Sequence, residues 1–94
     1  IVLVPVNELQ YLESLGNYVK VWAEKEFLLA PRTLTSFEEQ LPEDTFFRIH
    51  KSFIMNKNFV HYMEGNRIFL KNGTELPIGK NYLSVTKRLL NIEY

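Results

Sequence analysis

The chain has 94 residues, 46% of them hydrophobic and 23% charged, a length and composition typical of one globular domain. It contains no cysteine, which excludes disulfides, zinc sites with thiolate ligands and thiol nucleophiles. The net charge is zero, but residues 1–47 hold three basic and eight acidic side chains, and residues 48–94 hold eight basic and three acidic ones. A fold that separates these halves would present one strongly positive face.

The first residues of the chain are apolar, but Pro5 and Asn7 interrupt the run and no basic residue precedes it. This pattern predicts neither a signal peptide nor a membrane span. We therefore expect a cytoplasmic protein without a membrane partner. Because the sequence does not begin with methionine, we also expect it to be a fragment of a longer chain.

The first third of the chain has the residue types of short β-strands at 2–6, 9–14, 17–23 and 27–30. Pro5 would be tolerated only at an edge or a bulge. Gly16 and Asn17 predict a turn between the second and third of these strands, because glycine supplies backbone freedom and asparagine tolerates unusual dihedral angles.

A short helix is predicted next. Thr35 and Glu38 have the spacing of a capping box, and Ser36 and Glu39 offer a second register. The helix should end before Pro42, because the residue preceding a proline is disfavoured in helical conformation. One face of this helix is apolar and is expected to be buried; it contains Leu34, Phe37 and Leu41.

Residues 46–56, which read Phe-Phe-Arg-Ile-His-Lys-Ser-Phe-Ile-Met-Asn, mix core residues with hydrogen-bond donors. A strand that buries the apolar residues would present the donors as a row, which suits a phosphate backbone and can reach base edges. The donors are Arg48, His50, Lys51, Ser52 and Asn56. One alternative is a buried strand with an ordinary solvated face. Asn56 can equally be a structural turn residue.

The last third of the chain predicts a β-meander at residues 58–64, 67–71 and 74–78. Gly65-Asn66 and Asn72-Gly73 separate these strands, and Asn-Gly is a strong signal for a type I′ hairpin turn. Residues 82–91 predict a second short helix, although Val85 and Thr86 weaken it. The predicted fold is mostly β, with antiparallel strands and hairpins, one or two short helices, and loops that carry the function.

Enzymatic and metal sites have little support. His50 and His61 are eleven residues apart without clustered carboxylates, whereas zinc and iron sites use three or four ligands. Ser52 lies near His50 but lacks an orienting third group. The glycines are scattered singly and form no phosphate-binding loop. We therefore expect no enzymatic activity, no metal and no cofactor.

Three blocks, at residues 11–19, 48–56 and 76–82, together with Leu41-Pro42, resemble the LytTR family in order and spacing. LytTR domains are DNA-binding output domains of many bacterial response regulators. The resemblance covers nearly the whole chain and implies a single domain at residues 1–94 that binds double-stranded DNA through loops entering successive major grooves. It also implies a receiver domain outside this chain, a dimer assembled by that receiver, and paired direct repeats in a promoter.

The resemblance implies base contacts from Asn17, Lys51 and Lys80, which match family positions that contact bases. Asn17 can donate to and accept from a base edge, although it can also act only as a turn residue. Family members commonly have arginine at the positions of Lys51 and Lys80. Lysine lacks the planar fork of arginine, so the base preference is expected to be softer or different. Backbone contacts are expected from Tyr18, His50, Ser52, Asn81 and Tyr82, with diffuse help from Lys57 and Lys87.

Two other functions are considered. A β-rich protein-interaction or sensory module would show an exposed apolar patch on the order of several hundred Å², whereas a positive face with Lys51 and Lys80 exposed would favour DNA. Binding of single-stranded nucleic acid would need aromatic side chains that stand out of a sheet face. Most of the thirteen aromatic residues are expected in the core.

Overall fold

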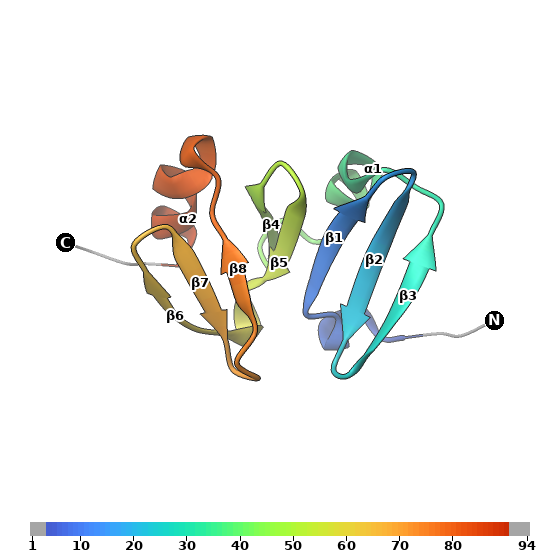
Figure 1. The fold of residues 1–94 in the computed structure, drawn as a ribbon, viewed down its shortest axis with the longest axis horizontal. Helices are drawn as coiled ribbons and strands as arrows, with labels where there is room; N and C mark the ends of the chain where they lie inside the picture. Colours follow the sequence, from blue (N-terminus) through green and yellow to red (C-terminus); the bar gives the residue numbers. More distant parts are fainter. Residues whose placement is uncertain (1–3, 91–94) are drawn as a thin grey trace.

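The computed structural model describes residues 4–90 and contains eight β-strands and two short α-helices (Figure 1). The strands form two antiparallel sheets, with the orders β3-β2-β1-β5-β4 and β6-β7-β8. The elements are β1 (Tyr11–Leu15), β2 (Tyr18–Ala23), β3 (Glu26–Ala30), α1 (Leu34–Gln40), β4 (Phe46–His50), β5 (Phe53–Asn56), β6 (Val60–Glu64), β7 (Arg67–Leu70), β8 (Glu75–Pro77) and α2 (Leu83–Leu89). The predicted fold class is confirmed.

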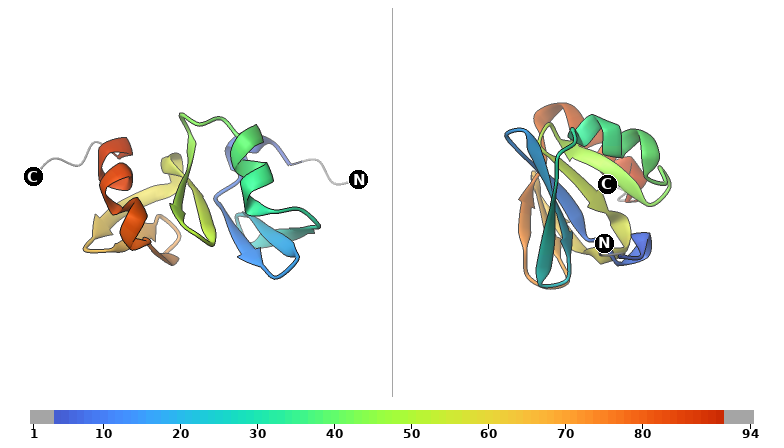
Figure 2. Two further views of the ribbon diagram at one scale, coloured as in Figure 1. Left: turned by 90° about the horizontal axis from the view of Figure 1, so that it is seen from above. Right: turned by 90° about the vertical axis from the view of Figure 1, so that its right-hand side faces the viewer.

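The molecule is elongated, with extents of 44 × 24 × 21 Å. The two sheets follow one another along the long axis, and both helices lie on the same side of them (Figure 2). The acidic N-terminal half of the sequence therefore lies mainly at one end of the molecule and the basic residues after position 56 at the other, while residues 48–56 belong to the larger sheet. This arrangement meets the condition under which a neutral chain presents a positive region.

Two hydrophobic clusters stabilise the fold. The first is built by the two sheets from Tyr11, Phe47, Ile49, Met55, Ile68, Leu70, Leu76 and Ile78. The second lies between the larger sheet and α1 and is built from Leu9, Leu12, Val19, Val21, Leu34, Phe46 and Ile54. Strands β4 and β5 contribute to both clusters, so this hairpin is covered on both faces.

The central segment is a hairpin, and the prediction of one donor-bearing strand is wrong. Phe46 and Ile54 face one cluster while their neighbours Phe47 and Met55 face the other. Because both faces are buried, apolar residues stand side by side in the sequence instead of alternating with exposed donors. The chain reverses at Lys51 and Ser52, so His50, Lys51 and Ser52 gather at the tip of a hairpin, whereas Asn56 lies at its base.

Asn56 is a structural turn residue, the second of the two roles considered for it, and not an exposed donor. Its side chain is fully buried, its Nδ2 donates to the carbonyl oxygen of Leu9 at 2.8 Å, and its Oδ1 accepts from the N–H of Asn58 at 2.9 Å. These bonds satisfy the amide inside the protein and cap the 3₁₀ turn Lys57–Phe59. Asn56 therefore offers no donor to a ligand.

The predicted strand at residues 2–6 is wrong in the part that the structure describes; residues 2 and 3 lie outside it. Val4 and Pro5 have no regular structure, and Val6–Glu8 forms a 3₁₀ turn. Pro5 has φ −57° and its carbonyl oxygen accepts from the N–H of Glu8 at 2.9 Å. A proline has no N–H for a sheet ladder, and its fixed φ suits the start of a turn.

Helix α1 begins earlier than its predicted capping boxes. Thr33 is the N-cap and its hydroxyl accepts from the N–H of Ser36 at 3.1 Å. The helix ends at Gln40, before Pro42 as predicted. Of its apolar residues, Leu34 is buried, whereas Phe37 and Leu41 are only half-buried at the border of the second cluster.

The C-terminal meander and helix are confirmed with shifted limits. Asn58 belongs to a 3₁₀ turn, and α2 starts at Leu83 after the 3₁₀ turn Lys80–Tyr82. Residue 91 of the predicted helix lies outside the described residues. The turns at 65–66 and 72–73 connect the strands as predicted, but in each of them only the glycine has positive φ, so they are not type I′.

Candidate nucleic-acid interface

Three connections lie at one edge of the molecule, and we call them together the loop edge. The β1–β2 turn contains Asn17. Strand β5 runs antiparallel beside β1, and the N–H of Ser14 donates to the carbonyl oxygen of Ser52 at 2.9 Å, so the β4–β5 turn stands next to the β1–β2 turn. The β8–α2 connection joins them because the N–H of Gly79 donates to the carbonyl oxygen of Ile49 at 2.7 Å. The loop edge is the upper margin of Figure 1.

Each predicted base-contacting residue lies on a different connection of the loop edge. Asn17 is on the β1–β2 turn, Lys51 on the β4–β5 turn and Lys80 on the β8–α2 connection, and all three are exposed. Neighbouring strands are about 4.8 Å apart, which places the first two turns roughly 10 Å apart, about three base-pair steps. The structure thus brings the three residues to one edge but spreads them along it.

Five of the predicted backbone-contacting residues also lie on the loop edge. Tyr18 and Asn81 are exposed, and the other three, His50, Ser52 and Tyr82, are half-buried. His50 is held by its own turn, since its Nδ1 accepts from the N–H of Ser52 at 3.0 Å. The other ring nitrogen, Nε2, is then left as the donor of the neutral ring.

Lys57 is not brought to the loop edge. It follows β5 at the end opposite the β4–β5 turn, and its N–H donates to the carbonyl oxygen of Thr45 at 2.9 Å. The four residues of β5 lie between it and Ser52, and the five steps along the extended strand separate the two by roughly 16 Å.

A basic groove of about 510 Å³ extends the loop edge along α2. It is lined by Lys80, Leu83, Ser84, Lys87 and Arg88. Lys87, predicted as a diffuse contact, therefore shares a groove with Lys80. Sequence reasoning missed Ser84 and Arg88. Their four-residue spacing, repeated by Leu83 and Lys87, was the available signal, because residues four apart are neighbours on a helix surface.

The end of the larger sheet opposite the loop edge, where the β2–β3 turn lies, is acidic. A groove of about 440 Å³ there is lined in part by Glu8, Glu24 and Glu26, which come from the first 3₁₀ turn, the β2–β3 turn and β3. Both turns lie at the end of the sheet remote from Asn17, because β1 and β2 run antiparallel between the two edges. The negative charge of the N-terminal half is thus partly directed away from the loop edge.

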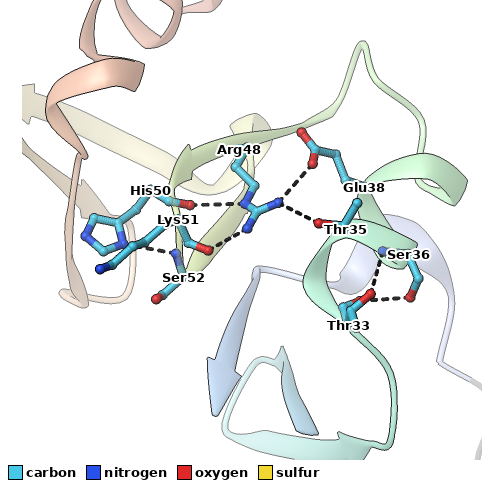
Figure 3. A network of polar contacts seen from close by, with 8 residues as sticks. All are labelled: Thr33, Thr35, Ser36, Glu38, Arg48, His50, Lys51 and Ser52. Carbon is cyan, nitrogen blue, oxygen red and sulfur yellow. Dashed lines mark hydrogen bonds and ion pairs between the residues drawn. The ribbon is translucent and has the colours of Figure 1, made fainter. Parts of the chain in front are cut away.

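Arg48 lies on β4, two residues before its end, and its side chain is 17% exposed. Its Nε donates to the carbonyl oxygen of His50 at 3.2 Å, and its Nη2 donates to that of Lys51 (Figure 3). Its Nη1 reaches α1, at 3.0 Å from Oε1 of Glu38 and 3.3 Å from Oγ1 of Thr35. The expectation of an outward-facing donor is therefore wrong for Arg48.

Within residues 4–90, no three histidine or acidic side chains gather closely enough to hold a metal ion. The same part of the chain has no helix of the length and apolarity that crossing a membrane requires. His61 lies on β6 and packs edge-on against Tyr62, with ring centroids 5.1 Å apart.

The comparison with protein families decides the identity of this fold. The profile of the LytTr DNA-binding domain matches residues 1–91. The chain belongs to the LytTR family. A solved structure, the LytTr DNA-binding domain of a putative methyl-accepting/DNA response regulator from Bacillus cereus, superposes on it with a TM-score of 0.88 and 31% identity, covering 95% of this chain and 86% of that one.

Curated relatives of this LytTR domain are larger proteins. The sensory transduction protein LytT of Bacillus anthracis is 30% identical over 97 residues, which cover 98% of this chain and 39% of that protein. The transcriptional regulatory protein YpdB of Escherichia coli K12 is 26% identical over 98 residues, covering 98% and 40%. The chain thus spans about two fifths of the length of these relatives.

Proposed function

We propose that this LytTR domain binds double-stranded DNA with sequence preference through its loop edge. The observation that carries the proposal is the convergence of Asn17, Lys51 and Lys80, exposed on three connections of one edge. Side chains carried by separate loops of one rigid body can enter different stretches of groove and so read different base pairs.

In this proposal, Asn17, Lys51 and Lys80 contact base edges. Positioning on the phosphates is assigned to the other polar residues of the loop edge and the basic groove: Tyr18, His50, Ser52, Asn81, Tyr82, Ser84, Lys87 and Arg88. Lys57 stays a predicted contributor through long-range attraction only, because it lies at the opposite edge. No residue is assigned a catalytic role.

For the whole protein, we propose a cytoplasmic response regulator that controls transcription. The names of the curated relatives support this assignment, since they describe sensory transduction and transcriptional regulatory proteins of more than twice this length. In such a protein a receiver domain would assemble a dimer, and two LytTR domains would bind paired direct repeats in a promoter.

Binding of single strands has weaker support than binding of duplex DNA. The large exposed aromatic side chains of the described residues are Tyr18, Phe27 and Tyr62, on β2, β3 and β6. Tyr62 stacks on Phe69 with centroids 4.5 Å apart, and Phe27 packs against Trp22 at 4.8 Å. Rings on three separate strands, two of them already paired, do not form one platform for successive bases.

The protein-interaction hypothesis is favoured by one observation, on strand β3. This strand is at the edge of the larger sheet and exposes Phe27, Leu28 and Leu29 by 42%, 42% and 54%. Edge strands with exposed apolar residues pair readily with other strands. The oligomeric state of the wild type and of Leu29→Lys at high concentration tests this hypothesis. If both proteins are monomeric, self-association through β3 is excluded.

A salt titration of the isolated domain tests the DNA proposal. With roughly five phosphate contacts, the logarithm of the binding constant should fall with the logarithm of salt concentration at a slope of about −4 to −5. The measurement needs a duplex obtained by selection from random sequences and a scrambled duplex of the same composition. Absence of binding, or binding that salt leaves unchanged, would contradict the proposal.

A further inference from the structure

The guanidinium of Arg48 forms hydrogen bonds to the backbone at the turn that carries Lys51. Two of its bonds end on the carbonyl oxygens of His50, the last residue of β4, and of Lys51, the first residue of the turn. Figure 3 shows the side chain of Arg48 lying between this turn and α1. The hydrogen-bond register between β4 and β5 shifts between Arg48 and His50, so the sheet ladder is irregular at this point. Arg48 therefore supplies hydrogen bonds where the ladder is disrupted.

The other end of this contact is fixed on α1. Nη1 of Arg48 forms an ion pair with Glu38 at 3.0 Å and donates to Thr35 at 3.3 Å. The turn is thereby joined to a helix whose Leu34 is buried in the second cluster. A side chain that recognises a ligand is effective when packing and hydrogen bonds fix the backbone segment that carries it.

Arg48 has little capacity left to bind DNA itself. Its guanidinium has five N–H donors, and the four bonds to protein acceptors engage Nε, Nη1 and Nη2. Its charge is paired with Glu38 and its side chain is 17% exposed. A phosphate contact would require breaking several of these bonds.

We propose that Arg48 is a positioning residue for base recognition, which sets the direction of Lys51 without touching DNA. This inference rests on the proposed function. A lysine at this position could not replace the arginine, because one ammonium group cannot span two carbonyl oxygens, a carboxylate and a hydroxyl in a planar fork.

The test compares Arg48→Met with Lys71→Met, which removes the same charge from an exposed residue of the β7–β8 turn. The readout is the ratio of affinities for the selected duplex and a scrambled duplex. Arg48→Met should lower this ratio about tenfold by relaxing preference at the base pair read by Lys51, whereas Lys71→Met should leave it unchanged. The salt slope on scrambled DNA should be the same for Arg48→Met as for the wild type.

A double-mutant cycle asks whether Arg48 acts through Lys51. In a Lys51→Ala background, Arg48→Met should change the ratio no further, because the side chain that it positions is absent. Thermal unfolding checks that the variants are folded. If Arg48→Met does not fold, Arg48→Lys, which keeps the charge but not the fork, carries the test and should show the same loss.

Three results would overturn the inference: an unchanged ratio in Arg48→Met, a salt slope weaker by about one unit, or additive effects of Arg48→Met and Lys51→Ala. The middle result would make Arg48 a phosphate contact. Failure of the proposed function is a different outcome, in which the wild-type domain itself selects no sequence.

Discussion

The backbone N–H of Gly79 donates a hydrogen bond of 2.7 Å to the carbonyl oxygen of Ile49. This bond joins the β8–α2 connection to the end of β4, although thirty residues separate the two in the sequence. It places Lys80 and Lys51 on neighbouring loops, and so makes one edge out of two segments that are distant in the sequence.

Gly79→Ala should disturb this junction. A Cβ at this position would lie 3.0 Å from Cδ2 of Tyr82 and 3.4 Å from Cα of His50. We expect a loss of about 1–2 kcal/mol in unfolding free energy, as overpacking causes, together with weaker base preference at the pairs read by Lys51 and Lys80. Urea denaturation and binding-site selection measure the two effects.

The control for this variant is Gly73→Ala, on the β7–β8 turn. Gly73 has φ +93°, and an added Cβ would have no atom within 4 Å beyond those of Gly73 and its two chain neighbours, so alanine there should cost about 1 kcal/mol through backbone strain alone. Its base preference should match that of the wild type. A Gly79→Ala protein that is destabilised but keeps full base preference would contradict the account of the junction.

Phe37→Ala should affect stability and not recognition. Phe37 is half-buried against the second cluster, with the guanidinium of Arg32 4.0 Å from its ring centroid. Because part of the ring is already exposed, we expect a loss of about 2–3 kcal/mol, less than the ~3–5 kcal/mol of a fully buried phenylalanine. Chemical denaturation gives this value, and binding below the unfolding transition should be unchanged. An unaltered unfolding midpoint with abolished DNA binding would show that Phe37 belongs to the interface.

Tyr11 should make the fold sensitive to alkaline pH. Burial, and to a lesser degree the negative charge of Glu13, raise the pKa of the Tyr11 phenol above its ordinary value of 10.0. The unfolded chain therefore ionises at lower pH than the folded one. The stabilisation is complete below pH 10.0 and is lost as the pH rises through the folded-state pKa. Urea midpoints from neutral to alkaline pH measure this loss, and Tyr11→Phe should lack that part of it. An identical alkaline decline in both proteins would assign the effect to other groups.

Much of the fold follows from local signals in the sequence. The turn at Gly16-Asn17, the stop before Pro42 and the meander after residue 58 depend on backbone preferences of single residues, which act without tertiary context. The strand predicted at residues 2–6 is not seen at Val4–Val6, because the fixed φ and missing N–H of Pro5 favour a turn.

The central hairpin could not be predicted by alternation alone. Alternation assumes that one face of a strand meets water, whereas β4 and β5 are covered on both faces, by clusters whose members come from both halves of the chain. For the same reason alternation predicts an exposed side chain at Arg48, which is in fact 17% exposed. Its partners Thr35 and Glu38 lie thirteen and ten residues away on α1, a proximity that no local pattern records.

In the candidate site, too, some features follow from the local sequence and others depend on tertiary packing. The sequence predicts turns or strand ends at Asn17, Lys51 and Lys80, and in the structure all three lie on connections between elements. The bond between Gly79 and Ile49, which brings two of these turns together, depends on tertiary packing, as does the groove that adds Arg88.

Binding-site selection on the wild type, Lys80→Ala and Lys87→Ala tests the central claim most directly. Both lysines line the basic groove, but Lys80 stands on the loop edge and Lys87 on α2. We expect Lys80→Ala to lose about 1–3 kcal/mol on the preferred site, to relax preference at one or two base pairs and to remain folded. Lys87→Ala should weaken all sequences alike and lower the salt slope by about one unit. If Lys80→Ala weakened every sequence equally, or if the wild type enriched no sequence, base reading from the loop edge would be contradicted.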